Sequence, residues 1–126
     1  MVYKHIVMWK FKEQHNGKSA LENARWMKEQ LEALVGVVPE LLSAEVGISP
    51  ALEQAAGAPA PVAAQSNAAA VPAQAASGEY DACLLSTFAS PEALAAYKVH
   101  PKHKAISAYC KEARLKRLAF DWWSEE

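Results

Sequence analysis

The sequence contains few cysteines, no excess of charge of either sign and no long run of apolar residues. Its two cysteines, Cys83 and Cys110, lack the spacing of metal ligands, and we expect both to be reduced and buried. The 13 Lys and Arg nearly balance the 14 Asp and Glu. Because a nucleic-acid-binding face needs clustered positive charge, we expect no nucleic acid partner. No apolar stretch approaches the length of a membrane span, so we expect no membrane partner either.

The first residues show no charged leader followed by an apolar stretch and a small-residue cleavage site. Together with the two thiols that we expect to be reduced, this pattern predicts a cytoplasmic protein. A length of 126 residues, of which 52% are hydrophobic, predicts a single domain spanning residues 1–126.

The stretch 51–78 differs in composition from the rest of the chain. It contains thirteen alanines, three prolines and a single charged residue, Glu53. Burying so few large apolar side chains would not offset the conformational entropy lost when the stretch becomes ordered. We therefore predict a mobile insertion between the second and third strands. A short helix at one end is an alternative. A partner-binding segment is another, although a solvated loop is the more ordinary explanation.

Hydrophobic patterning and capping signals predict the order β-α-β-β-α-β for the remaining residues. Ser19 and Glu22 form a capping-box pattern after the turn Asn16-Gly17, and the first helix should end near Gly36. Ser90 and Pro91 begin the second helix. The strands are predicted at residues 2–11, 41–48, 79–88 and 115–123.

This order predicts an α+β protomer of the ferredoxin-like type, with a four-stranded antiparallel sheet and both helices on one face. The first strand carries Tyr3, His5 and Val7 on one face, but Ile6 and Met8 on the other. Both faces of the sheet therefore need a cover. A second copy of the same sheet would cover the helix-free face, which predicts a homodimer enclosing a barrel-like core.

Three of the four histidines are candidates for one site. Histidine titrates close to neutral pH, so a small shift makes it a proton donor or acceptor there. His100 precedes Pro101, where the second helix should break, and we expect it to cap the restarted helix. His103 follows one turn later, and His5 lies in the first strand. Each also has a structural explanation, as a packed or backbone-bonded residue, and we expect His15 to be solvated.

Two short motifs give the sequence a family resemblance. Lys4-His5 near the start and His100-Pro101-Lys102-His103-Lys104 late in the chain, with Tyr80-Asp81 between them, resemble the stress-responsive A/B barrel (Dabb) domain. The resemblance covers essentially all residues outside 51–78. It implies a dimeric α/β barrel of ferredoxin-like protomers. Most members of the family are described by stress induction or by fold alone.

One class of the family, the plant polyketide cyclase that makes olivetolic acid, closes a linear polyketide without a metal or cofactor. The resemblance implies that His103 would be the general base, with His5 and Tyr97 as catalytic partners that bind the developing enolate. Leu31 stands where these cyclases have a tyrosine on the first helix. Because leucine cannot donate a hydrogen bond, this position favours a different ligand or a binding role.

Two functions therefore remain as hypotheses. The first is a homodimeric Dabb protein of undefined activity that binds a small apolar or aromatic molecule. The second is a cofactor-free, cyclase-like lyase or isomerase. We expect no cofactor and no metal, because no carboxylate or cysteine completes a ligand set with the histidines. The candidate substrate-binding residues are Trp9, Met27, Leu31 and His100.

Overall fold

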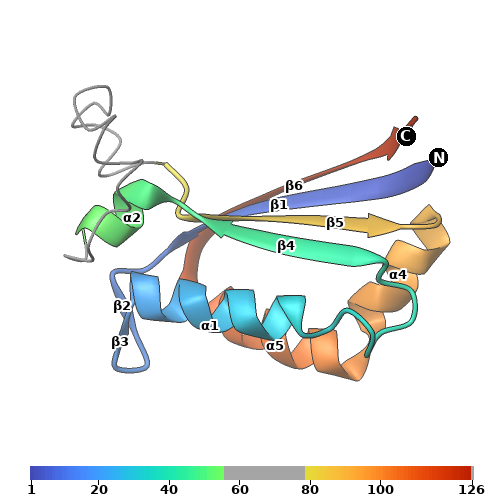
Figure 1. Ribbon diagram of the computed structural model, residues 1–126. Helices are drawn as coiled ribbons and strands as arrows, with labels where there is room; N and C mark the ends of the chain where they lie inside the picture. The colour runs from blue at the N-terminus through green and yellow to red at the C-terminus, as the bar shows by residue number, and fades with distance from the viewer. Residues whose placement is uncertain (56–78, 126) are drawn as a thin grey trace.

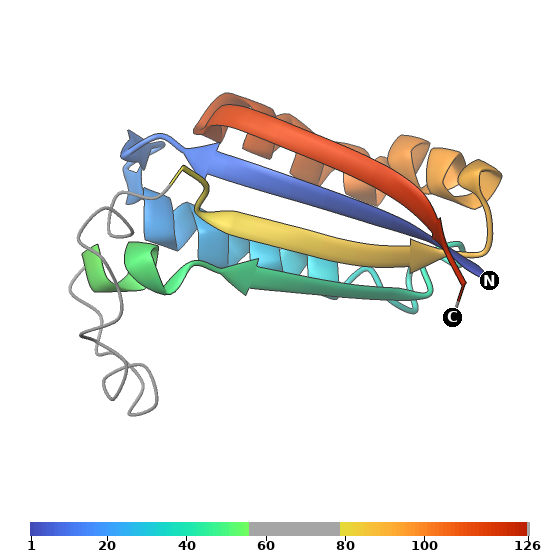
Figure 2. The ribbon, with the colours of Figure 1, turned by 90° about the horizontal axis from the view of Figure 1, so that it is seen from above.

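The computed structural model describes residues 1–55 and 79–125. A four-stranded antiparallel sheet lies over one layer of helices, with strand order β4-β5-β1-β6 (Figure 1). Figure 1 shows the helices on one face of this sheet, and Figure 2 shows α1 under the β4 side and α4 and α5 along the β6 side. The predicted α+β, ferredoxin-like fold class is confirmed. In chain order the main elements are β1 (Val2–Phe11), α1 (Ala20–Glu32), β4 (Ser43–Ile48), α2 (Pro50–Ala55), β5 (Ala82–Phe88), α4 (Pro91–Val99), α5 (Pro101–Ala113) and β6 (Arg114–Ser124).

The central strand β1 alternates between the two faces of the sheet. His5, Val7, Trp9 and Phe11 are buried on the helix-covered face, as the sequence pattern predicts. β1 pairs with β5 on one side and with β6 on the other, both antiparallel. This central place buries β1 between two neighbours and puts its side chains at the middle of the domain.

A short hairpin connects β1 to α1, through β2 (Gln14–His15) and β3 (Lys18–Ser19). Asn16 and Gly17 have φ values of 57° and 75°, the positive pair that a tight hairpin turn of this type requires. The predicted turn is therefore confirmed. The expectation that His15 is solvated is wrong in part, because its half-buried ring packs edge-on against Tyr109, with ring centroids 5.4 Å apart.

The capping box at the start of α1 is confirmed. The Glu22 backbone N–H donates to Ser19 Oγ at 3.1 Å, and the Ser19 N–H donates to the Glu22 carboxylate at 3.0 Å. The helix ends at Glu32, earlier than the predicted end near Gly36. Gly36 instead occupies the turn that follows, with φ at +87°, a conformation that glycine adopts at little cost.

The strands β4 and β5 start later than predicted. Leu41 is buried in the core and its N–H donates to the carbonyl of Val38 in a turn, so β4 begins only at Ser43. Asp81 precedes β5. Its carboxylate accepts from the N–H of Phe11 at 2.9 Å and from Lys10 Nζ at 3.1 Å. This buried side chain ties the start of β5 to the end of β1.

The second helix breaks where the sequence predicts. His100 has an extended backbone, with φ −63° and ψ 135°, and lies between α4 and α5. Its ring Nδ1 accepts from the backbone N–H of Lys102 at 3.1 Å, so His100 caps α5. The proline after it supplies a fixed φ at the first helical position. The predicted structural role of His100 is confirmed.

The stretch 51–78 begins in a folded element. Its first five residues belong to α2, in which Ala51 is buried and Leu52 packs against the core. The expected short helix at one end of the stretch is therefore present. The rest of the predicted insertion, residues 56–78, lies outside the described residues.

The helix-free face of the sheet exposes large apolar side chains. In the β1–β6 pairing Ile6 lies opposite Phe120 and Met8 opposite Leu118, and in the β1–β5 pairing Ile6 lies opposite Leu85. Phe120, Leu118 and Leu85 are all exposed. We call these five residues the open-face patch.

Among the described residues, no helix is long and apolar enough to cross a membrane.

Candidate functional site

A cavity of about 350 Å³ lies between the helix-covered face of the sheet and α5. Its apolar wall includes Trp9 from β1, Leu31 from α1 and Ile106 from α5. His5 and His103 both line it, although 98 residues separate them in the sequence. Both reach it because β1 is a central strand of the sheet and α5, which begins after the break at His100, lies on the helix-covered face (Figure 1). A single cavity therefore holds two of the three predicted catalytic side chains.

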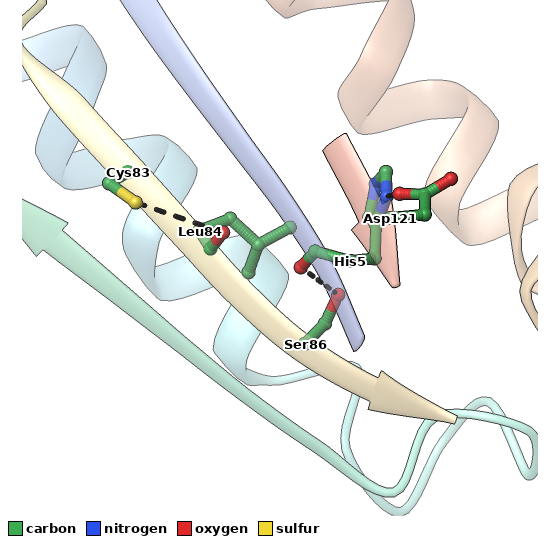
Figure 3. A network of polar contacts seen from close by, with 5 residues as sticks. All are labelled: His5, Cys83, Leu84, Ser86 and Asp121. Carbon is green, nitrogen blue, oxygen red and sulfur yellow. Dashed lines mark hydrogen bonds and ion pairs between the residues drawn. The ribbon is translucent and has the colours of Figure 1, made fainter. Parts of the chain in front are cut away.

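His5 is held by a carboxylate from the neighbouring strand. Asp121 on β6 lies directly opposite His5 on β1 in the strand register, and its Oδ1 binds the ring Nδ1 of His5. Figure 3 shows the two side chains pointing toward one another. On the other side of β1, Ser86 Oγ donates to the backbone carbonyl of His5 at 3.2 Å. With Nδ1 engaged by Asp121, Nε2 is the nitrogen that remains for a bound molecule.

The pKa of His5 lies below its ordinary value. Burial lowers this pKa, because it removes the solvation of the charged imidazolium, while the hydrogen bond and charge of Asp121 raise it without cancelling the effect of burial. The positive charges of Lys98 and Arg117 lower it further. At neutral pH His5 is therefore a neutral imidazole, able to accept a proton.

His103 lies on α5, one turn after the helix break. Its ring Nδ1 is 3.2 Å from the backbone carbonyl of Lys98. Because a carbonyl oxygen can only accept, we assign the ring hydrogen to Nδ1, which leaves the lone pair on Nε2. Burial lowers the pKa of His103, and the nearby His5, Arg117 and Lys98 lower it further against the opposing effect of the Lys98 carbonyl. His103 is thus a second neutral imidazole in the cavity.

Tyr97 lies behind His103 rather than in the wall of the cavity. Its ring centroid is 4.3 Å from that of His103 and 5.2 Å from that of Phe88. The side chain is 1% exposed, and its hydroxyl has no hydrogen-bond partner among the described residues. Burial raises the pKa of Tyr97 above its ordinary value, so the hydroxyl stays protonated. Tyr97 therefore packs against the His103 ring, and its hydroxyl is a hydrogen-bond donor without a partner among the described residues.

The structure divides the predicted substrate-binding residues into two groups. Trp9 and Leu31 line the cavity. Met27 is fully buried in the core and does not line it, and His100 lies at the helix break, away from the cavity wall. Two of the four predicted substrate-binding residues therefore line the cavity.

Sequence reasoning missed Asp121. A signal was present, because Asp121 is the only acidic residue between 115 and 123. In the β-α-β-β-α-β order the first and last strands lie side by side and antiparallel. Aligning the two antiparallel strands residue by residue would place Asp121 near His5. The exact register of the pairing, however, is known only from the tertiary structure.

Sequence reasoning also missed a group of basic side chains around the cavity. Lys98, Lys111, Arg114 and Arg117 all line it. The run of positive charge from Lys111 to Arg117 is visible in the sequence, but nothing in the sequence shows that it borders a cavity. We call these four residues the cationic rim.

Cys110 also lines the cavity but is not a reactive nucleophile. Burial raises the pKa of its thiol to about 12, although the charge of Arg114 opposes this. The thiol is therefore protonated at neutral pH, and the thiolate is the nucleophilic form. Cys83 and Cys110 are both free, as predicted, and Cys83 is half-buried.

Among the described residues, no group of three His, Cys, Asp or Glu side chains could hold a metal ion.

Comparison with models of known protein families shows the family to which this chain belongs. The model of the stress-responsive A/B barrel domain (Dabb) matches residues 3–66 and 57–124. The chain belongs to this family, as the motifs around His5 and His103 predict. No curated protein matches the sequence.

Several solved structures share the fold. A dimeric, ferredoxin-like protein of unknown function from Bacteroides fragilis has a TM-score of 0.68 at 21% identity, over 98% of this chain and 96% of that chain. A dimeric ferredoxin-like protein of unknown function from Thermobifida fusca has a TM-score of 0.65 at 18% identity, over 98% and 92%. The hydroxynitrile lyase from Passiflora edulis has a TM-score of 0.65 at 16% identity, over 99% and 95%. These TM-scores show a common fold.

Proposed function

We propose that this Dabb protein binds a small organic molecule in the cavity lined by His5 and His103. The observation that carries the proposal is the meeting of both imidazoles in one cavity of about 350 Å³. This volume lies within the range of small-molecule sites, which are mostly apolar with a few placed polar groups. Perturbed pKa values at residues in a cleft also favour a functional site.

The proposal is tested by following the imidazole signals of the protein by NMR while acetophenone or naphthol is added. We expect the signals of His5 and His103 to shift with a common saturation curve. His15, on the hairpin, does not line the cavity and serves as the internal control. An Ile106→Trp variant should fill the cavity and remove the shifts. Shifts that are absent from both histidines, or that persist in Ile106→Trp, would contradict the proposal.

We further propose that the protein is a homodimer in which the open-face patch of one copy packs against that of a second. Leu118 and Phe120 are exposed on the sheet face that no helix covers. An isologous pairing buries this face on both copies at once. The similar proteins from Bacteroides fragilis and Thermobifida fusca are described as dimeric, which supports the proposal.

A cytoplasmic location also stays a proposal, supported by the two free thiols.

A second candidate function, cofactor-free proton transfer, is favoured by the His5–Asp121 pair. Nε2 of His5 would take a proton from a carbon next to a carbonyl group, leaving an enolate. The imidazolium so formed would be stabilised by Asp121, and it would return the proton to the enolate. His103, with a carbonyl partner in place of a carboxylate, is less suited to carry the positive charge. One of the similar structures is a hydroxynitrile lyase, so the fold can carry an enzyme.

The enzymatic proposal predicts that the protein catalyses the exchange of the acidic protons of acetylacetone for deuterium. We expect His5→Gln to slow the catalysed exchange by about a hundred-fold, within the usual range for a general base. Asp121→Asn should slow it less. Lys104→Gln, on the same helix as His103 but outside the cavity wall, is the control. An unchanged rate in His5→Gln would rule out this assignment of the base.

A further inference from the structure

The cationic rim carries four positive charges, and the negative charge of Asp121 acts on one of them, Arg117. Ion pairs elsewhere in the described residues join Lys10 to Asp81, Lys28 to Glu32 and Lys116 to Glu79. None of the four rim residues forms an ion pair with a described carboxylate. Asp121 shares the helix-covered face of β6 with Arg117, but its carboxylate binds His5.

The ordinary explanation of such charges covers only part of the rim. Lys98 lies in the last turn of α4 and Lys111 in the last turn of α5, where cations complement the helix dipole. Arg117 lies on β6, opposite Trp9 in the strand register, and no helix end accounts for it. Burial lowers the pKa of Arg117 and the charge of Arg114 lowers it further, against the opposing charge of Asp121, so the two guanidinium groups repel each other. A bound anion would relieve this repulsion.

We propose that the cavity takes an elongated, mainly apolar ligand whose carboxylate is bound by Arg114 and Arg117 while its other end lies against His5 and His103. Guanidinium groups match the planar, two-oxygen geometry of a carboxylate. The apolar body of the ligand lies against Trp9 and Ile106, which line the cavity. This inference rests on the proposed small-molecule binding and adds the chemical class of the ligand.

The spacing along β1 separates the backbone positions at the two ends of the cavity. His5 and Asp121 form one cross-strand pair, and Trp9 and Arg117 form another pair four residues further along β1. At about 3.3 Å per residue, the backbones of the two pairs are roughly 13 Å apart. The long Arg117 side chain shortens the span between the charged groups, because its charge acts on His5 and His103. A ligand that touches both ends is therefore a carboxylate that carries an apolar chain or ring.

The test compares octanoate with octanamide, which has nearly the same shape but no charge. Calorimetry on the wild-type protein should show octanoate binding at least ten-fold more tightly, because charge-assisted hydrogen bonds to arginine are the stronger kind. The double variant Arg114→Gln/Arg117→Gln should lose this preference, while Arg117→Lys should keep part of it. Lys104→Gln keeps the full preference, since Lys104 is an exposed cation of α5 outside the cavity wall.

Equal affinities for octanoate and octanamide in the wild-type protein would overturn the inference, as would a preference that survives in the double variant. The outcome also separates this inference from the proposed function. If acetophenone or naphthol shifts His5 and His103 while octanoate shows no advantage, small-molecule binding stands and the carboxylate assignment falls. If none of the four probes binds, both fall.

Discussion

Asp121 on β6 binds the ring Nδ1 of His5 on β1, and the two residues are direct partners in the antiparallel register of the two strands. The sheet itself therefore sets the position of the pair, without help from a loop. A site built on adjacent strands holds its side chains more rigidly than one built on loops. This relationship fixes which nitrogen of His5 remains for the cavity.

Removing the charge of Asp121 should lower the pKa of His5 further. Asp121 raises this pKa through its hydrogen bond and its charge, against the opposing effect of burial. In Asp121→Asn we therefore expect the imidazole of His5 to titrate at a lower pH than in the wild-type protein, as measured by NMR. Asp81→Asn is the matched control, because Asp81 is also a carboxylate beside β1 but binds Lys10 and Phe11. A His5 titration that is unchanged in Asp121→Asn would contradict the assigned pairing.

The stability of the protein should fall as the pH drops through the range where unfolded histidines titrate. The folded-state pKa values of His5 and His103 both lie below the ordinary value of 6.5. Below pH 6.5 the unfolded chain therefore binds protons that the folded chain does not, which favours unfolding. Urea unfolding should show a free energy of unfolding that is steady above this pH and decreases below it, down to the folded pKa values. In His103→Gln the decrease should be smaller, and an equal decrease would contradict the lowered pKa.

Two tyrosine-to-phenylalanine substitutions should have opposite effects on stability. The hydroxyl of Tyr97 is buried without a partner among the described residues, whereas that of Tyr109 donates to the buried Asn23. Because Tyr97→Phe removes an unsatisfied polar group, we expect the free energy of unfolding to stay the same or rise. Tyr109→Phe should lower it by about 1 kcal/mol, since it breaks a hydrogen bond. Thermal and urea unfolding of both variants measure the difference, and a loss of stability in Tyr97→Phe would show that its hydroxyl is used.

A charge on the open-face patch should separate the proposed dimer. Phe120 and Val99 are both 64% exposed, but Phe120 lies on the helix-free face of the sheet and Val99 lies at the end of α4. Light scattering should report twice the monomer mass for the wild-type protein and for Val99→Glu, but the monomer mass for Phe120→Glu. An isologous interface places the substitution twice, so each dimer would bury two added charges. A wild-type monomer, or a dimer that persists in Phe120→Glu, would contradict the proposed interface.

Local sequence signals were enough to predict most elements of the fold. The capping box at Ser19 and the break at His100-Pro101 depend on side chains bonding to backbone groups a few residues away, so the sequence shows them directly. The starts of β4 and β5 were predicted less well, because contacts between distant segments determine them. Asp81 illustrates this, since its partners Lys10 and Phe11 lie 71 and 70 residues away in the sequence.

The sequence alone was sufficient to predict the α+β fold class, the family and the two histidines that share a cavity. These follow from hydrophobic periodicity, capping chemistry and two short motifs, all of which act over short distances along the chain. Only the tertiary structure decided that Asp121 binds His5, that Met27 belongs to the core, and that Lys111, Arg114 and Arg117 border the cavity. Strand register and helix packing fix those relationships, and both depend on contacts between residues far apart in the sequence.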